Sequence, residues 1–561
     1  MRRIPTIFIF LVLYTLICIP AFGENKNGSS LSWDGADTEK FIASMSDSEL
    51  VGQLFLFGYM GKKPSDEILS WIRDKHVGGI KIFGWNASDL ETLGESIAAM
   101  QKTALDTRLG IPLLIATDQE GGWVRHIKGE TSITPGALSI GATNLPYDAY
   151  QTGLNIGIEL KALGVNMNFA PTIDIYLNPN THVIGPRSFS SDPVKVGVFG
   201  QAFFRGLDES GVISTAKHFP GHGNAEEDSH GTLPVLEDDL DTLRSRELIP
   251  YRFLIKEGIP AIMSGHLAFP KVTGTDEPAS LSRTMLSGLL REELGFTGII
   301  VTDDLEMHGA QETGSSFAGI CETAVRAGND ILMISRSQAD KTAAYERLLA
   351  LTQKDPEFKA LVTQAVRRIL AVKKRYLGND ANFPLIPDER TIEEKIPSGT
   401  EFYRQQAFRS ITLLQKGRIP FSAEDAEGKK VVLAGQFSAF LAEGNKRYPE
   451  AETFLFSYSP FYSSVASEKR KLISLASRAD TVIFCLATPG SIEMLKALEP
   501  YKEKVIVMSA LTPVYLSQVP WVESALAVYG TGADSFFAGF AALVGDFDPT
   551  GTLPISFSGL P

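Results

Sequence analysis

Short apolar segments alternate with helix-like stretches about eight times over about 300 residues of this chain, starting near residue 50. Apolar runs of strand length, each followed by a stretch with helical periodicity, are typical of parallel sheets in which a helix returns the chain after every strand. Eight such units predict an α/β fold with a TIM-like (β/α)8 barrel. The eight segments are VGQLFLFGY, VGGIKIFGW, PLLIATDQEGG, VNMNFAPTIDI, ISTAKHFPG, AIMSGHL, GIIVTDDLEM and DILMIS.

The stretches between these segments carry helix signals. Residues 88–108 and 282–295 have the apolar spacing of a helix, and the second stretch begins at Ser282, a favourable cap, and ends at Gly295. A long helical pattern then covers residues 338–376.

The length of 561 residues exceeds what one hydrophobic core usually organises, so we expect more than one domain. A polar segment with proline and glycine predicts a linker at residues 379–400, between a catalytic barrel at residues 32–378 and a second domain at residues 401–561. Five further strand-like segments predict that the second domain is an α/β sandwich. No histidine occurs after His308, so we expect this domain to contribute no catalytic residue. The five segments are KKVVLAGQ, TFLFSYS, ADTVIFCLATPG, EKVIVMSAL and ALAVYGTG.

Charged and imidazole side chains gather at the C-terminal ends of the predicted barrel strands. A (β/α)8 barrel carries its active site at that rim, whereas purely structural charges would be scattered over both ends. The residues concerned are Asp118, Asp174, Lys217, His218, His266, Asp303 and Asp304.

The composition, 44% hydrophobic and 21% charged, is that of a globular protein. A net charge of −13 argues against nucleic acid or an anionic membrane as the main partner. Beyond the N-terminus, we find no segment that is long and apolar enough for a stable membrane span. The mature chain is expected to keep two cysteines, Cys321 and Cys485, which predict no disulfide framework.

The N-terminus has two arginines, an apolar run and then Ala21-Phe22-Gly23 before a polar stretch, which is typical of an export signal. The apolar run is shorter than the ~20 residues that a membrane span needs. We therefore expect a signal peptide at residues 1–23 and an exported protein, periplasmic or extracellular. Lipid anchoring at Cys18 is disfavoured, because Ile17 is not the small residue that such sites prefer.

The histidines near residue 220 raise the alternative of a metal site. His218 and His222 have the spacing of two zinc ligands on one helix face, but Pro220 lies between them and disfavours a helix there. A metal site formed by His218, His266 and Asp303 is still an alternative, but we disfavour it because short motifs often match by chance.

KHFPGHG at residue 217, followed by DSH at residue 228, resembles the signature of the family 3 glycoside hydrolases, in the branch of β-N-acetylhexosaminidases. DQEGG at residue 118, NFAPTIDI at residue 168, IGPRSFSSDP at residue 184 and GIIVTDDLEM at residue 298 are similar to further blocks of that family, in the same order. The second domain is similar to the sandwich domain of two-domain members and closes on GTLPISF. Several long blocks in order are more specific than one motif.

The resemblance implies a retaining mechanism, in which Asp303 attacks the anomeric carbon and forms a covalent glycosyl-enzyme. It also implies that His230 is the acid/base and that Asp228 orients it. The residue types suit these roles, because residues i and i+2 of an extended segment share a face and an adjacent carboxylate favours the imidazolium. Histidine titrates near neutrality, so it can both donate and accept a proton.

The resemblance further implies a set of sugar-binding residues, although a structural ion pair is the alternative for two of them, Lys217 and Arg187. After DQEGG the family usually has the pattern RV-x-R, whereas this sequence has WVRH, so Arg125 and His126 are further candidates and the subsite preference there is open. The implied sugar-binding residues are Asp118, Arg187, Lys217 and His218.

The resemblance implies an exo-acting β-N-acetylglucosaminidase without cofactor or metal, whose partner is a carbohydrate from peptidoglycan fragments or chitin oligosaccharides. The nearest alternatives are a β-glucosidase or β-xylosidase of the same family and an N-acetylglucosaminide phosphorylase. A metal-dependent barrel hydrolase and an inactive glycan-binding protein are more distant ones. The oligomeric state and the role of the second domain stay open.

Overall fold

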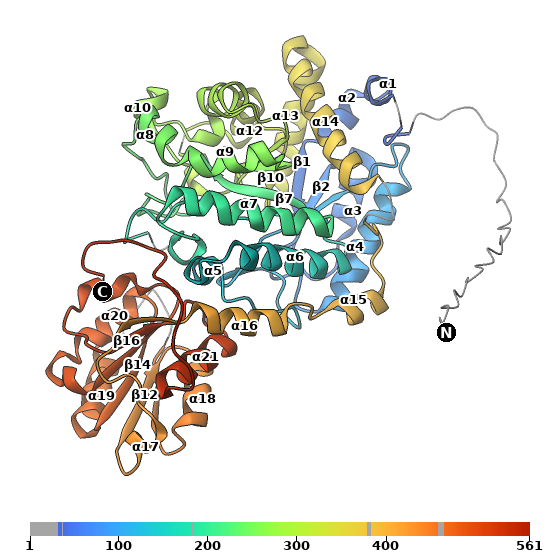
Figure 1. Ribbon diagram of the computed structural model, residues 1–561. Coiled ribbons are helices and arrows are strands. Elements are labelled where there is room, and N and C mark those ends of the chain that lie inside the picture. The colour runs from blue at the N-terminus through green and yellow to red at the C-terminus, as the bar shows by residue number, and fades with distance from the viewer. Residues whose placement is uncertain are drawn as a thin grey trace, which may run out of the picture.

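The structure of the protein is a computed structural model, and it falls into two parts. In Figure 1 the larger part runs from blue to yellow and the smaller from orange to red, and α16 (Thr400–Ser410) leads from one to the other. The predicted signal peptide lies outside the described residues. Within those residues, no helix combines the length and apolar character that a membrane span requires. The structure describes residues 32–35, 37–181, 183–312, 314–378, 383–457 and 465–560.

An eight-stranded parallel sheet forms the barrel, in the order β10-β1-β2-β3-β6-β7-β8-β9. A parallel bridge between Val301 and Ile331 joins the last strand to the first and closes it. Each predicted segment contains one strand of the barrel, and every residue of these strands is buried, as expected where helices cover a parallel sheet. The predicted (β/α)8 barrel is therefore confirmed. The strands are β1 (Phe55–Gly58), β2 (Gly79–Lys81), β3 (Leu114–Thr117), β6 (Met167–Asn168), β7 (Ile213–Phe219), β8 (Ala261–Ser264), β9 (Ile299–Thr302) and β10 (Leu332–Ile334).

Helices surround this sheet, and a small hairpin of β4 (Gln119–Gly121) and β5 (Val124–Arg125) follows β3. The helices are α1 (Thr38–Ala43), α2 (Asp47–Gly52), α3 (Asp66–Lys75), α4 (Leu90–Leu105), α5 (Ala137–Thr143), α6 (Pro146–Ala162), α7 (Pro193–Ser210), α8 (Leu240–Ser245), α9 (Leu248–Glu257), α10 (Pro270–Thr273), α11 (His308–Gln311), α12 (Phe317–Ala327), α13 (Gln338–Lys354) and α14 (Pro356–Leu377). Two short 3₁₀ helices, η1 (Gly185–Arg187) and η2 (Ala279–Leu281), and a π-helix, η3 (Thr284–Glu293), complete the barrel part.

The long helix predicted over residues 338–376 is wrong, because the structure has two helices there, α13 and α14. They separate at Asp355, which adopts an extended conformation and whose carboxylate accepts hydrogen bonds from the backbone N–H groups of Glu357 and Phe358. The residue before a proline avoids the helical conformation, and Pro356 is well suited to the first turn of the next helix. The predicted stop at Gly295 is correct, since its φ of 71° ends the π-helix.

The second part contains a six-stranded sheet in the order β11-β16-β15-β14-β12-β13. Its strands are parallel except for β11, which pairs antiparallel with β16 at the edge of the sheet and was missed from the sequence. The strands are β11 (Thr412–Gln415), β12 (Val431–Gly435), β13 (Glu452–Leu455), β14 (Thr481–Leu486), β15 (Val505–Ser509) and β16 (Ala525–Ala527). Its helices are α17 (Ala423–Ala426), α18 (Ser438–Arg447), α19 (Val465–Arg478), α20 (Pro489–Lys496) and α21 (Ala533–Val544), with the 3₁₀ helices η4 (Glu499–Lys504) and η5 (Pro513–Gln518). The helix before α16, α15 (Glu389–Lys395), packs against α4 and α6 of the barrel.

The two parts are joined by polar contacts. Ser190 donates a hydrogen bond to the carbonyl of Pro554 at 2.6 Å, and Arg409 forms an ion pair with Asp148 at 2.7 Å. The apolar core of the second sheet also includes Tyr176 of the barrel. The predicted domain limits themselves stay predictions.

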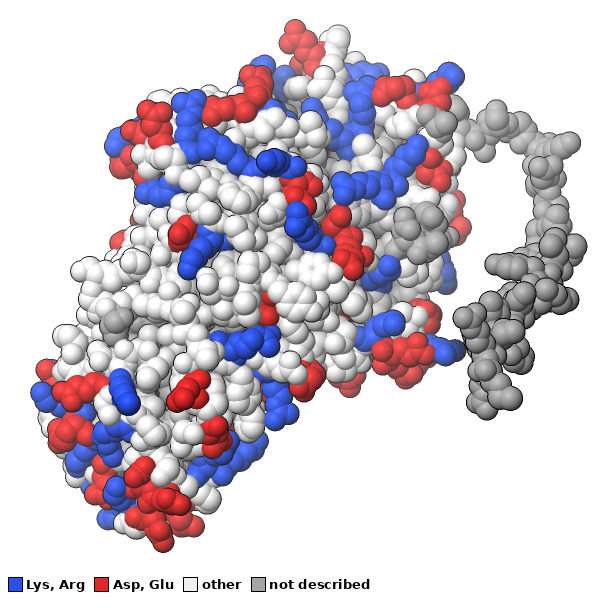
Figure 2. Space-filling view, viewed as in Figure 1, with Lys and Arg blue, Asp and Glu red and all other residues white. Residues whose placement is uncertain are grey.

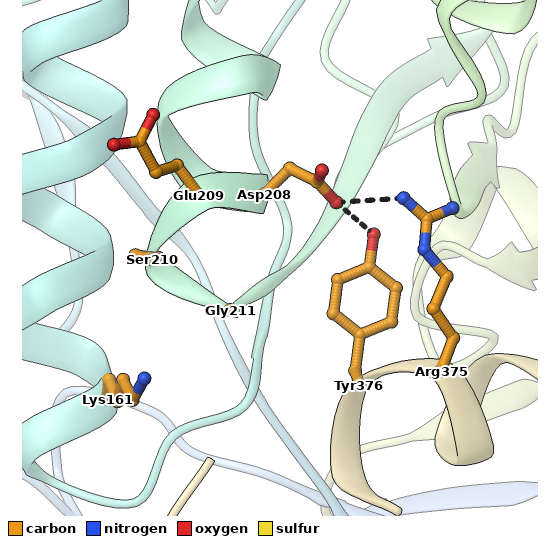
Figure 3. Close-up of a pocket in the computed structure, with 7 residues that line it drawn as sticks. All are labelled: Lys161, Asp208, Glu209, Ser210, Gly211, Arg375 and Tyr376. Atoms are coloured by element: carbon orange, nitrogen blue, oxygen red, sulfur yellow. Dashed lines mark hydrogen bonds and ion pairs between the residues drawn. The ribbon is translucent and has the colours of Figure 1, made fainter. Parts of the chain in front are cut away.

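The outer surface mixes both signs of charge. Figure 2 shows basic and acidic side chains interspersed over both parts of one face. At the end of the barrel opposite the strand C-termini, a depression contains Asp208, which accepts hydrogen bonds from Tyr376 at 2.5 Å and Arg375 at 3.1 Å (Figure 3). A contact at this end contributes to the stability of the barrel, because barrel active sites lie at the other end.

Candidate active site

A cavity of about 660 Å³ lies at the C-terminal ends of the barrel strands. Seven of the nine predicted site residues line it, and Asp228 and Arg125 are the two that do not. The cavity thus occupies the place where (β/α)8 barrels carry out catalysis. The seven residues are Asp118, His126, Arg187, Lys217, His218, His230 and Asp303.

A chain of buried ion pairs crosses one wall of this cavity. Asp118 pairs with Lys81 and, at 2.5 Å, with Lys217, which also lies 2.6 Å from Glu120. Arg187 binds both oxygens of Glu120, at 2.7 and 2.9 Å. Burial alone would raise the pKa of Glu120, but Arg187 and Lys217 lower it to about 2. The same pairing lowers the pKa of Asp118 and raises the pKa values of Lys217 and Arg187, so these groups are held ionised, with fixed donors and acceptors of the kind that bind sugar hydroxyls.

His218 is oriented by a buried carboxylate at the end of the neighbouring strand. Its Nδ1 lies 2.7 Å from Asp174, and its Nε2 lies 3.4 Å from a guanidinium nitrogen of Arg187. Asp174 also accepts a hydrogen bond from the backbone N–H of His222 at 2.7 Å. Burial would raise the pKa of Asp174, but the adjacent His218 lowers it to about 2.

Asp303 follows β9, and its backbone N–H donates to Ser264 O at 3.0 Å. Its Oδ1 accepts a hydrogen bond from the backbone N–H of Asp304 at 2.8 Å. Burial would raise the pKa of Asp303, but the charges of His218 and His266 lower it. By contrast, burial raises the pKa of Asp304 to about 6. Of the two aspartates, Asp303 is therefore the better ionised and the better suited to be a nucleophile.

His230 and Asp228 form the pair that the sequence predicted. Nδ1 of His230 lies 2.7 Å from Asp228 Oδ1, and the same oxygen accepts the backbone N–H of His230 at 3.0 Å. The hydrogen bond with Asp228 raises the pKa of His230, although burial opposes it. His230 lines the cavity, whereas Asp228 contacts His230 without lining the cavity.

An aromatic wall borders the cavity beside β2. Phe83 and Trp85 stack with their ring centroids 4.3 Å apart, and the guanidinium of Arg336 lies 5.1 Å from the Trp85 ring. The backbone around Arg336 is fixed by Glu306, whose carboxylate accepts N–H groups of Arg336 at 2.7 Å and Ser337 at 2.5 Å. Phe83, Glu306 and Arg336 line the cavity and were not predicted.

The two candidate sugar-binding residues of the WVRH stretch, Arg125 and His126, lie in different places. Arg125 donates hydrogen bonds to the carbonyls of Thr131 and Ser132, at 3.3 and 3.1 Å, and stays outside the cavity. His126 lines the cavity, with Nδ1 3.4 Å from Lys81 Nζ, and burial together with that cation lowers its pKa to about 4. The structure thus brings a neutral imidazole, not an arginine, to this wall.

Sequence reasoning also missed Lys81 and Glu120. Both are buried, and both are paired with residues predicted for the site. A lysine at the end of an otherwise apolar strand segment was the available signal for Lys81, because such a charge requires a partner once it is buried.

The described residues contain no group of three or more His, Cys, Asp or Glu side chains that could hold a metal ion. His266 uses both ring nitrogens, at 2.7 Å from Ser280 Oγ and 3.1 Å from Asp304 O. Cys321 and Cys485 are buried free thiols.

Comparisons with known proteins point to one family. The sequence model of the "Glycosyl hydrolase family 3 N terminal domain" matches residues 46–372, which is more than half of the chain. The chain is 36% identical over 331 residues to "Beta-hexosaminidase A" of Pseudoalteromonas piscicida, covering 53% of this chain and 55% of that protein. It is also 36% identical over 280 residues to "Beta-hexosaminidase" of Tolumonas auensis, covering 49% of this chain and 81% of the relative. The match thus spans little more than half of the first relative and most of the second.

A solved structure at 29% identity matches both parts of the fold. It is a "glycoside hydrolase family 3 beta-N-acetylglucosaminidase" from Paenibacillus sp. str. FPU-7, with a TM-score of 0.82 and 29% identity, covering 91% of this chain and 99% of that chain. A "Beta-glucoside phosphorylase BglX" has a TM-score of 0.76 at 22% identity and shows similarity of fold alone.

Proposed function

Since this chain belongs to glycosyl hydrolase family 3, we propose that it is an exported, exo-acting β-N-acetylglucosaminidase that works with retention of configuration. The observation that carries the proposal is that a partly buried Asp303 with a lowered pKa and a carboxylate-paired His230 line one cavity. A nucleophile and a proton donor around one cavity are the requirements of a retaining glycosidase.

In the first step an oxygen of Asp303 attacks the anomeric carbon while the bond from that carbon to the leaving oxygen breaks. The imidazolium of His230 gives its proton to the leaving oxygen, so the aglycone departs as a neutral alcohol. The resulting glycosyl-enzyme is an ester of Asp303, and His230 is left neutral.

In the second step neutral His230 takes a proton from a water molecule as the water oxygen attacks the anomeric carbon. The ester bond breaks, Asp303 regains its negative charge, and His230 regains its proton. Two displacements at one carbon return the original configuration. Asp228 stabilises the imidazolium that exists before and after each cycle, through its hydrogen bond to Nδ1.

The ionised wall supports binding of a terminal sugar. Asp118, Lys217 and Arg187 offer acceptors and donors whose positions are fixed by ion pairs. The packed barrel strands close the inner end of the cavity, which supports attack on the end of a glycan and not on its interior. The names of the hexosaminidase relatives and of the matching N-acetylglucosaminidase structure support N-acetylglucosamine as that sugar.

Export and the natural glycan are further parts of the proposal. The N-terminal arginines, apolar run and cleavage motif near Gly23 support a periplasmic or extracellular protein. An exported enzyme of this specificity would meet peptidoglycan fragments or chitin oligosaccharides.

A panel of aryl β-glycosides that differ only at the 2-position tests the proposal. The aryl N-acetyl-β-glucosaminide should react faster than the β-glucoside by orders of magnitude, up to about 10⁴-fold, because a site that binds a polar substituent rejects analogues without it. Equal or inverted rates would instead indicate a β-glucosidase. Product analysis with added phosphate separates hydrolysis, which yields the free sugar, from phosphorolysis, which yields the sugar phosphate.

A further inference from the structure

The loop after β7 carries the proposed acid/base pair, and both ends of this loop are fixed to the barrel. At the first end, the carbonyl of Gly223 accepts a hydrogen bond from the N–H of Leu177 at 3.1 Å. At the second end, the N–H of Ala268 donates to the carbonyl of Pro234 at 2.9 Å. Residues 227–233, called the loop tip below, lie between these fixed ends.

One serine in the loop tip is buried between two exposed neighbours. Ser229 is only 4% exposed, whereas the side chains of Asp228 and His230 are 48% and 72% exposed. Residues 229–231 form a turn, in which the carbonyl of Asp228 accepts hydrogen bonds from the N–H groups of Gly231 and Thr232, and within this turn the side chain of Ser229 is packed against the barrel. The loop tip therefore meets the barrel at Ser229.

Within the described residues, both hydrogen bonds from the loop tip to the rest of the chain involve Ser229. Its hydroxyl forms a long hydrogen bond with His222 Nε2 at 3.4 Å, and its carbonyl accepts the N–H of Gly309 at 3.1 Å. His222 is itself fixed, because it is buried and its backbone N–H donates to Asp174. Burial lowers the pKa of His222 to about 4, so the contact with Ser229 is made by a neutral ring at neutral pH.

Gly309, in α11, lets the loop tip approach closely. A Cβ atom built on Gly309 would lie 3.1 Å from three atoms, which are the carbonyl oxygens of Ser229 and Thr232 and Cβ of His266. Such contacts are tighter than packed protein interiors normally contain, so a side chain at this position would displace the loop tip.

We propose that Ser229 is a positioning residue, which holds His230 at the cavity through its contacts with His222 and Gly309. The inference rests on the proposed role of His230 as the acid/base. A proton donor must lie within hydrogen-bond reach of the leaving oxygen, and a displacement of about 1 Å can cost about 10²-fold in rate. Loosening the loop tip therefore slows reactions that need the proton. The bond between Asp228 and His230 lies within the loop tip and stays intact.

The test compares two variants, Ser229→Ala and Gly309→Ala, on phenyl and 2,4-dinitrophenyl N-acetyl-β-glucosaminide. Phenoxide needs a proton to leave and dinitrophenoxide does not. On the phenyl glycoside, kcat should fall about 10-fold for Ser229→Ala and up to about 10²-fold for Gly309→Ala. The formation of the glycosyl-enzyme from the dinitrophenyl glycoside should be nearly unchanged, and the alkaline limb of the pH profile should keep its midpoint.

Matched controls are Glu227→Ala, an exposed residue of the same loop tip, and Gly319→Ala in α12. Both controls should behave as the wild type. Equal losses on the two glycosides, no loss in either variant, or a displaced alkaline limb would overturn the inference. If Gly309→Ala does not fold, Ser229→Ala still decides the question. A wild-type protein that is inactive on both glycosides would contradict the proposed function instead.

Discussion

Nδ1 of His230 lies 2.7 Å from a carboxylate oxygen of Asp228, on a loop that overhangs a cavity also lined by Asp303. One ring nitrogen is thus committed to a carboxylate, and the hydrogen bond raises the pKa of the imidazole. Many retaining glycosidases use a second carboxylic acid as the proton donor. Here the pairing gives a histidine the two properties that this role demands, which are a fixed orientation and a proton that is held near neutral pH.

Replacing His230 by alanine should slow substrates in proportion to how much their leaving group needs a proton. On a natural disaccharide we expect kcat to fall by about 10²–10⁴-fold, the usual contribution of general acid catalysis. On a dinitrophenyl glycoside the first step should be nearly spared, and the glycosyl-enzyme should accumulate in a burst. Equal slowing of both substrates, measured by stopped-flow and steady-state kinetics, would assign His230 to sugar binding instead.

Replacing Asp303 by alanine should abolish turnover, because no other group would form the covalent intermediate. In the wild type, a 2-deoxy-2-fluoro or 5-fluoro glycoside should label Asp303, as peptide mass spectrometry of the trapped enzyme would reveal. Asp304→Asn serves as the matched control and should retain labelling at Asp303. A label on Asp304 or Asp174 would reject the assignment, and loss of wild-type activity with chelators would revive the metal hypothesis.

Replacing Arg125 should mainly affect stability, whereas replacing His126 should mainly affect activity. Arg125→Met removes hydrogen bonds to the carbonyls of Thr131 and Ser132, so it should lower the free energy of unfolding by about 1–3 kcal/mol and leave kcat/KM nearly unchanged. His126→Ala alters the cavity wall and should lower kcat/KM about tenfold, the equivalent of one hydrogen bond. Denaturant unfolding and steady-state kinetics on both variants measure this; the reverse pattern would show that Arg125 reaches the substrate.

Replacing Glu120 by glutamine should destabilise the barrel, because it leaves Arg187 and Lys217 buried with one charge fewer. Breaking a buried ion pair costs about 3–5 kcal/mol, measured as the free energy of unfolding at pH 7. The pKa of Glu120 is lowered from 4.5 to about 2, so its stabilisation is complete above pH 4.5 and is lost as the pH falls toward 2. The wild type should therefore lose more stability than Glu120→Gln between pH 5 and pH 3; parallel pH curves would contradict this account.

The barrel could be predicted because its signals are local. Eight apolar segments, each bounded by turn residues and followed by helical periodicity, require only the neighbouring sequence to be recognised. The missed strand β11 is four residues long, partly exposed and antiparallel at the edge of a sheet, so its pattern is weak. The break between α13 and α14 was missed although Pro356 marked it, because the apolar spacing continues past the proline.

The pairing of Asp228 with His230 and the presence of Asp303 at the same cavity could be predicted from the resemblance, but the wall of ion pairs could not. Asp118 meets Lys81 and Lys217, and Glu120 meets Arg187, only because closure of the barrel brings different strand ends together. No periodicity in a single sequence encodes which buried charge pairs with which. The same reason explains why Arg125 was expected at the substrate, since hairpin geometry and not spacing turns it away from the cavity.

The pH dependence of the wild type should follow His230 on the alkaline side. The first step needs the imidazolium, whose pKa is raised above 6.5, so kcat/KM for a phenyl glycoside should be high below that raised pKa and fall as the pH rises through it. Asp303 has a lowered pKa and stays ionised well into the acid range, which leaves the alkaline limb clearly separated. Asp228→Asn removes the negative charge beside His230 and weakens the hydrogen bond to Nδ1. The imidazolium then loses its proton more easily, so the midpoint of the alkaline limb should move to lower pH. Glu227→Gln removes one exposed negative charge from the same loop and should leave the midpoint in place. Profiles from pH 4 to pH 9 on the three proteins decide the matter, and an unmoved midpoint in Asp228→Asn would mean that another group supplies the proton.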